Sequence, residues 1–252
     1  MFGATVLAWA YVFHWAPLSR EYDRPTHAAR AVLTTAITVP LVVLARRLMD
    51  RRPWAGLGLP WSDTARRHLL LGVACWTLPA AVGFAMCLGL GWARVSLRTS
   101  VAEAFAIAAL LLVLVFLYEA LPEELVFRGY LQRNLVTALP PWLSVLGQAL
   151  LFVLAGFALG TARSPGRLVI FLAFGLLLGA FRVATGDIWA GIGFHMAFQA
   201  AAQLLVGEGA VFEVEDGRAA LELVGLGLPF AFGWTALNVL HKATPDWKSP
   251  EP

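Results

Sequence analysis

Two adjacent carboxylates and an arginine, Glu123, Glu124 and Arg128, stand in a chain that is otherwise strongly apolar. A charged side chain in a membrane interior costs roughly 2.5–3.5 kcal/mol or more, so such groups are paired, functional or both. Arg128 follows Glu124 by four residues, which places the two on one face of a helix where they can pair. Glu123 is left as the carboxylate without an assigned structural partner.

Pro122 precedes the two acids and predicts a helix boundary, because proline lacks the N–H that would continue the preceding helix but fits the first turn of a new one. We therefore expect one span to end near residue 121 and a new helix to begin at Pro122. The plain interpretation of the acids is that they cap this helix and pair with Arg128 and Arg133.

A second polar group, His195 and Gln199, lies in the apolar stretch 188–206. The two are four residues apart and share one helix face. His195 comes about seven residues into the stretch, a depth of about 10 Å that is compatible with Glu123. A lone histidine in a span is often a packed core residue, whereas an imidazole and an amide on one helix face, opposite a pair of glutamates, favour a functional site.

The composition indicates what surrounds these groups. Of the 252 residues 59% are hydrophobic and 14% charged, and the mean hydropathy is +0.71, whereas a soluble domain is about 25% charged. We predict an all-α fold, a polytopic transmembrane helical bundle of about eight spans of ~20 residues, forming one integral membrane domain over 1–252. The expected spans are residues 2–18, 31–45, 69–92, 102–121, 142–159, 168–182, 188–206 and 221–240.

The arginines predict the orientation. Six of them lie in the connection 46–67, which the positive-inside rule places in the cytoplasm, with both termini inside and the acidic loop 207–220 outside. Arg20, Arg24 and Arg30 run against this rule. We expect a bacterial-type inner or plasma membrane, lipids as partners and no nucleic acid. Both cysteines fall in one apolar segment, which argues against disulfides and a cysteine metal site.

At these positions the sequence resembles the CPBP family of intramembrane proteases, also called the Abi or CAAX-protease family, which includes the Rce1-type endopeptidases. Its Glu-Glu-x-x-x-Arg motif is matched by Glu123, Glu124 and Arg128, and its His-x-x-x-Asn motif by His195 with Gln199 in place of asparagine. The connector 182–189 is also similar. The resemblance covers about residues 117–205, and we expect the family-like core at approximately 102–206.

The resemblance implies hydrolysis of a peptide bond within the bilayer, near the C-terminus of a membrane-bound or lipidated substrate. Glu123 would activate the water, His195 would polarise the carbonyl group, and Gln199 would donate to the oxyanion. Glu124 with Arg128 would hold the first carboxylate in place.

One position departs from the family. Its second motif, Phe-x-x-x-His, aligns with residues 152–156, where Gly156 replaces the histidine. In the family this histidine is thought to bind a metal or orient water. Glu123 and His195 would then be ligands of an incomplete site for a divalent metal such as zinc, which generally has at least three protein ligands. We expect a cavity with a bound water beside Gly156. A pseudo-protease that acts as a membrane scaffold or peptide or lipid binder, and a small-molecule transporter, are the alternatives.

Overall fold

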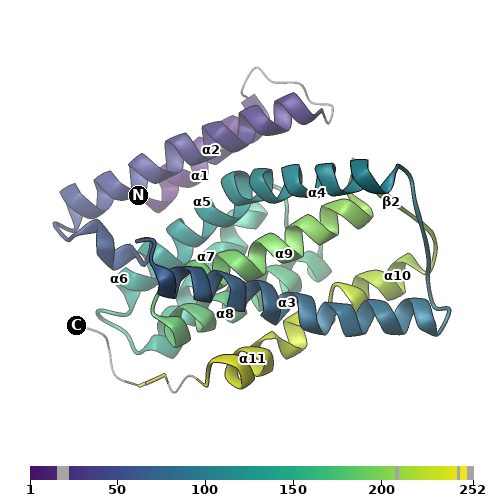
Figure 1. Cartoon of the computed structure of the whole chain (residues 1–252). Coiled ribbons are helices and arrows are strands. Elements are labelled where there is room, and N and C mark those ends of the chain that lie inside the picture. Colours follow the sequence, from purple (N-terminus) through teal and green to yellow (C-terminus); the bar gives the residue numbers. More distant parts are fainter. Residues whose placement is uncertain (16–22, 208–209, 243–244, 249–252) are drawn as a thin grey trace.

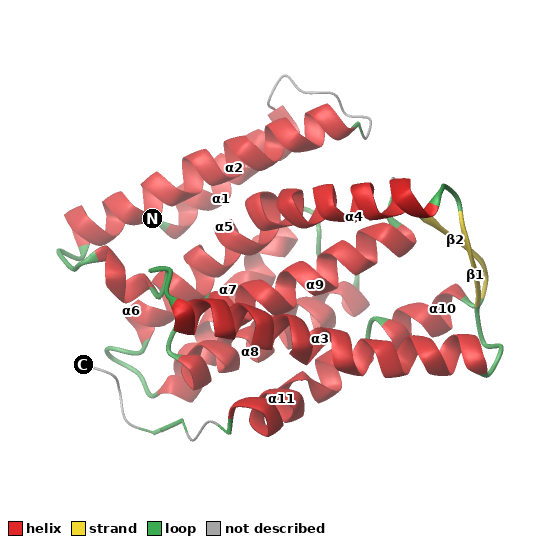
Figure 2. Ribbon diagram, viewed as in Figure 1, coloured by secondary structure: helices red, strands yellow, loops and turns green. Residues whose placement is uncertain are grey.

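A computed structural model describes residues 1–15, 23–207, 210–242 and 245–248 (Figure 1). The chain forms a bundle of helices, and the only sheet in the described residues is a short antiparallel pair of strands at one end of it (Figure 2). The predicted all-α fold is confirmed. The end of the first predicted span, Arg20 and positions 208–209 of the acidic loop lie outside the described residues.

The helices are, in chain order, α1 (Phe2–Ala10), α2 (Arg24–Leu44), α3 (Asp63–Gly89), α4 (Val101–Val115), α5 (Leu121–Glu124), α6 (Arg133–Leu135), α7 (Pro141–Ala158), α8 (Pro165–Thr185), α9 (Trp189–Val206), α10 (Arg218–Ala220) and α11 (Leu228–His241). Wider, π-helical segments extend or join several of them, at Tyr11–Trp15, Ala45–Met49, Phe116–Ala120, Leu125–Gln132 and Leu221–Gly225, and a 3-10 turn lies at Trp54–Leu57. The strands β1 (Arg94–Leu97) and β2 (Phe212–Asp216) pair antiparallel.

Within the described residues, each of the eight predicted spans lies mainly in helical segments of this bundle. Six helical stretches are long and apolar enough to cross a membrane: Arg24–Met49, Asp63–Gly89, Val101–Leu135, Pro141–Ala158, Pro165–Thr185 and Arg218–His241. Phe2–His14 is a shorter apolar helix. The remaining segment, α9, is 18 residues long and less apolar because it carries His195, Gln199 and Gln203.

The predicted boundary at Pro122 is wrong, because the helix continues from Val101 to Leu135. It changes to π-helical geometry at Phe116–Ala120, just before α5, and again at Leu125–Gln132, just after it. A π-helical segment accommodates local disruption of the hydrogen-bond ladder, such as the N–H missing at proline, without ending the helix.

Close helix crossings bring α9 into the centre of the bundle. A Cβ atom at Gly72 of α3 would lie 1.9 Å from the Ala190 carbonyl oxygen, and one at Gly193 would lie 2.1 Å from the Leu69 carbonyl oxygen. Only glycine permits this approach of the two backbones. The start of α9 is fixed as well, since the Trp189 backbone N–H donates to Asp187 Oδ1 at 3.0 Å. The polar face of α9 is thereby held against the helix that carries the paired acids.

Candidate functional site

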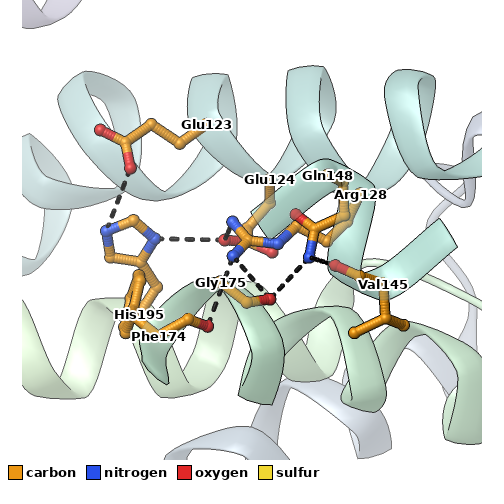
Figure 3. Close-up of polar contacts among 8 residues, drawn as sticks. All are labelled: Glu123, Glu124, Arg128, Val145, Gln148, Phe174, Gly175 and His195. Carbon is orange, nitrogen blue, oxygen red and sulfur yellow. Dashed lines mark hydrogen bonds and ion pairs between the residues drawn. The ribbon is translucent and has the colours of Figure 1, made fainter. Parts of the chain in front are cut away.

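The two acids lie in the short α-helical segment α5, between two π-helical segments. Such segments are rare in proteins, and those that occur often lie at functional sites. Figure 3 shows Glu123 and Glu124 reaching from this helix toward His195 of α9. The structure thus brings together four of the predicted residues, Glu123, Glu124, Arg128 and His195.

Glu124 and Arg128 form an ion pair that is closed off from solvent. Arg128 Nη1 lies 2.8 Å from Glu124 Oε1, and both side chains are 0% exposed. Arg128 Nη2 also donates to the backbone carbonyl oxygens of Phe174 and Gly175 in α8, each at 3.4 Å, and the guanidinium carbon lies 5.0 Å from the centroid of the Phe152 ring. A buried charge needs several such partners, and here α8 and the aromatic ring supply them.

Glycine at position 191 makes room for the Glu124 carboxylate on the α9 side. A Cβ atom there would lie 2.6 Å from Glu124 Oε2. On the α8 side, Gln148 of α7 donates to the carbonyl oxygen of Gly175 at 2.6 Å and to that of Val145 at 3.0 Å (Figure 3). Arg128 and Gln148 therefore share the Gly175 carbonyl oxygen as an acceptor. This links the helix Val101–Leu135, called the motif helix below, to both α7 and α8.

His195 lies between the two carboxylates. Its Nδ1 is 3.3 Å from Glu124 Oε1 and its Nε2 is 3.9 Å from Glu123 Oε2, as the dashed lines in Figure 3 mark. The side chain is buried, and the Phe174 ring meets it edge to face at 4.7 Å between centroids. Because Glu124 accepts from Arg128, it is best served by an N–H at His195 Nδ1, which directs the Nε2 lone pair toward Glu123.

Glu123 and Glu124 are adjacent in sequence but differ in accessibility. The Glu123 side chain is 26% exposed, whereas that of Glu124 is fully enclosed. Glu123 is thus the carboxylate that a water molecule or a substrate can reach.

Gln199 contacts a residue that sequence reasoning missed. Its amide nitrogen donates to Glu119 Oε2, and Gln203 Nε2 donates to Glu119 Oε1 at 3.0 Å. Two spacings in the sequence carried this signal. Glu119 precedes Glu123 by four residues within an apolar span, and Gln203 follows Gln199 by four residues.

The expected cavity beside Gly156 is absent, because an aromatic ring fills it. A Cβ atom at Gly156 would lie 2.4 Å and 2.7 Å from two ring carbons of Phe171, and 3.2 Å from Ala162 Cβ. The Phe171 ring stacks on that of Phe152, with 5.0 Å between centroids and an angle of 22° between planes. An imidazole at position 156 would therefore displace Phe171.

The donor set does not fit the expected zinc site. Among the described residues no group of three His, Cys, Asp or Glu side chains could hold a metal ion. The two carboxylates face different nitrogens of His195, so their oxygens do not converge with one nitrogen on a common point, and Glu124 is engaged by Arg128. Zinc in proteins generally takes at least three converging protein ligands.

Comparison with known proteins gives one match. Residues 105–201 match the protein-family model described as Rce1-like, "Type II CAAX prenyl endopeptidase Rce1-like". Searches of curated proteins and of solved structures gave no significant match. The matched stretch begins in α4, ends in α9 and contains Glu123, Glu124, Arg128 and His195. With its membrane-spanning helices the chain is an integral membrane protein, and the Rce1-like domain at residues 105–201 supports membership of the CPBP family.

Proposed function

We propose that the protein is an endopeptidase that hydrolyses a peptide bond in a membrane-bound or lipidated substrate, with Glu123 as the general base. The observation that carries this proposal is the position of His195, whose two nitrogens face two different carboxylates at 3.3 Å and 3.9 Å. Glu124 and Arg128 orient the imidazole, and the accessible Glu123 is left to take part in the chemistry. The family description supports a prenylated peptide as the substrate.

The gap between His195 and Glu123 suits a bridging water. The 3.9 Å from Nε2 to Oε2 is too long for a direct hydrogen bond, and contacts of this length are often mediated by water. In the proposed reaction this water donates one hydrogen bond to His195 Nε2 and transfers its other proton to Glu123 as it attacks the carbonyl carbon. Glu123 then passes that proton to the leaving amine nitrogen. The second amide N–H of Gln199 is the proposed donor to the oxyanion.

Replacing Glu123 by glutamine tests this function. We expect Glu123→Gln to lower the kcat for cleavage of a prenylated membrane peptide in proteoliposomes by about 10²- to 10⁴-fold, because the general base is lost. The matched control is Glu103→Gln, the same change at an exposed position of the same helix, and it should leave cleavage unchanged. Equal cleavage by the Glu123→Gln variant and the unmodified protein would refute the proposal.

A second candidate function, a pseudo-protease that binds lipidated or membrane peptides without cutting them, is favoured by Gly156. The ring of Phe171 lies against that glycine, at the position that the family gives to a histidine. This candidate predicts that the unmodified protein binds a prenylated peptide but cuts none of a panel of such peptides. It also predicts that Glu123→Gln leaves binding unchanged.

Restoring the histidine distinguishes the two candidates further. Gly156→His alone should destabilise the protein by roughly 1–3 kcal/mol, because the imidazole overlaps Phe171. The double variant Gly156→His/Phe171→Ala removes that overlap and is expected to regain most of the stability. If a latent site persists, the double variant should also gain cleavage or zinc affinity, whereas Phe171→Ala alone should not.

We also propose that both termini face the cytoplasm, together with the connection 46–67. Five of its six arginines are exposed, which supports contact with an aqueous or headgroup layer. The sixth, Arg46, is buried and donates to Asn134 Oδ1 at 2.9 Å, so it ties this connection to the motif helix instead. A C-terminal reporter that is active only in the cytoplasm tests the orientation, and a signal only from a periplasmic reporter would reverse it.

A further inference from the structure

A third acidic side chain, Glu119, lies one helical turn before Glu123 on the helix Val101–Leu135. Both of its oxygens accept from α9, one from Gln199 Nε2 and the other from Gln203 Nε2 at 3.0 Å. A carboxylate inside an apolar bundle is costly unless its oxygens are satisfied, and two amides satisfy them here. Of these three residues only Gln199 occupies a family-motif position, and Glu119 and Gln203 lie outside the motifs.

Three polar side chains of α9 form one ladder of contacts between two helices. His195, Gln199 and Gln203 recur every four residues on α9, so they lie along one face of that helix. His195 faces Glu123 and Glu124, while Gln199 and Gln203 face Glu119. The order along α9 is the reverse of that along the motif helix, as two antiparallel helices require.

The Glu119 carboxylate fixes the orientation of the Gln199 side-chain amide. An ionised carboxylate only accepts hydrogen bonds, so it selects the NH2 end of the amide and turns the carbonyl oxygen away. Gln199 reaches Glu119 through a side chain one methylene longer than asparagine, a difference of about 1.5 Å. An asparagine at position 199 would therefore fall short of this bond.

We propose that Glu119 is a positioning residue for the reaction: together with Gln203 it fixes the Gln199 amide one helical turn from His195. This inference rests on the proposed endopeptidase function. It explains why glutamine stands where the family has asparagine, since the longer arm is held by an acid on the facing helix. Glu119 acts through Gln199 and has no described contact with His195.

A double-mutant cycle on cleavage of a prenylated membrane peptide tests the proposal. Glu119→Gln and Gln199→Asn should each lower kcat by about 10²-fold, because each releases the amide from its position, and should change KM much less. The double variant should be no slower than the slower single variant, since both changes remove the same interaction. Additive losses, about 10⁴-fold together, would overturn the proposal.

An exchange variant separates positioning from a purely structural link between the helices. Glu119→Gln/Gln199→Glu retains one acid and one amide across the same gap, so the melting temperature should stay near that of the unmodified protein. The amide is then missing at position 199, and kcat should remain low. Full recovery of kcat in the exchange variant would show that the pair only joins the helices, which overturns the proposal.

Two further measurements keep the inference separate from the proposed function. If Glu123→Gln abolishes cleavage while Glu119→Gln leaves kcat unchanged, only the positioning role is refuted. If no peptide is cut at all, the side-chain amide NMR signal of Gln199 remains a test. It should shift in Glu119→Gln and stay in place in Glu103→Gln, and an unshifted signal in both would refute the role of Glu119.

Discussion

Two arginine–glutamate pairs in this protein share their spacing and their distance but not their surroundings. Glu124 with Arg128 and Arg218 with Glu222 are each four residues apart and 2.8 Å between nitrogen and oxygen. The first pair is 0% exposed, whereas the side chains of Arg218 and Glu222 are 61% and 46% exposed. The same spacing and the same distance therefore occur in a sealed part of the bundle and on its surface.

Burial changes the cost of losing one member of an ion pair. An exposed pair is screened by solvent and contributes about 0–1 kcal/mol. A buried pair contributes little net stability as a pair, but the loss of one partner leaves a charge with no solvent to stabilise it. Glu124 and Arg128 are thus mutually dependent, and their additional contacts to His195, Phe174 and Gly175 make them a fixed frame for the imidazole.

The largest effect that separates the two pairs should come from Arg128→Met. It leaves the Glu124 carboxylate buried without its cation, and we expect a loss of roughly 3–5 kcal/mol in the free energy of unfolding. Thermal unfolding in detergent, together with the yield of folded protein, measures this loss. A change below about 1 kcal/mol would mean that Glu124 is solvated or protonated without penalty, and the buried pair would then resemble the exposed one.

Replacing both members shows whether the charges serve folding or chemistry. In Glu124→Leu/Arg128→Met no uncompensated charge remains, and replacement of a buried pair by apolar side chains is often neutral or stabilising. We expect the double variant to be more stable than Arg128→Met alone but inactive in peptide cleavage, because His195 has lost its orienting carboxylate. Cleavage at the unmodified rate would remove Glu124 from the proposed mechanism.

A smaller effect is expected from substitution of Gly191, which lies against Glu124 of the buried pair. Alanine there places a methyl group 2.6 Å from Glu124 Oε2, and the resulting shift should cost roughly 1–3 kcal/mol. Gly166→Ala is the matched control, since no heavy atom lies within 4 Å of a Cβ atom at that position. The unfolding temperatures of the two variants should differ, and equal values would mean that the Glu124 carboxylate moves freely.

The sequence predicts that the Glu124–Arg128 pair is buried, because the neighbouring residues differ between the two pairs although the spacing does not. Residues 123–128 follow a long apolar run, whereas Arg218 and Glu222 follow an acidic loop. The same apolar runs predicted the helical bundle, and within the described residues each predicted span is mainly helical. By length and composition six helical stretches could cross a membrane, and α9 is not among them because its hydropathy is lowered by the side chains that face the site.

Three features were not predicted from the sequence, and two of them depend on how neighbouring helices meet. The helix through Pro122 continues by adopting π-helical geometry, which no local pattern announces. The Phe171 ring reaches Gly156 from the next helix, 15 residues away in sequence. Gln199 turns to Glu119 because α9 runs antiparallel to the motif helix, so the amide meets the acid one turn before Glu123.

The smallest expected effect is that of Arg218→Met, the surface counterpart of Arg128→Met. Because Glu222 remains hydrated after the change, the free energy of unfolding should fall by only about 0–1 kcal/mol, and peptide cleavage should be unaffected. Raising the salt concentration sharpens the test, since ions screen an exposed pair but hardly reach a buried one. The difference in stability between Arg218→Met and the unmodified protein should therefore vanish at about 1 M salt, whereas that for Arg128→Met should persist. A loss of several kcal/mol in Arg218→Met would mean that the surface pair is enclosed by another part of the protein or by a partner, and the contrast between the two pairs would no longer hold.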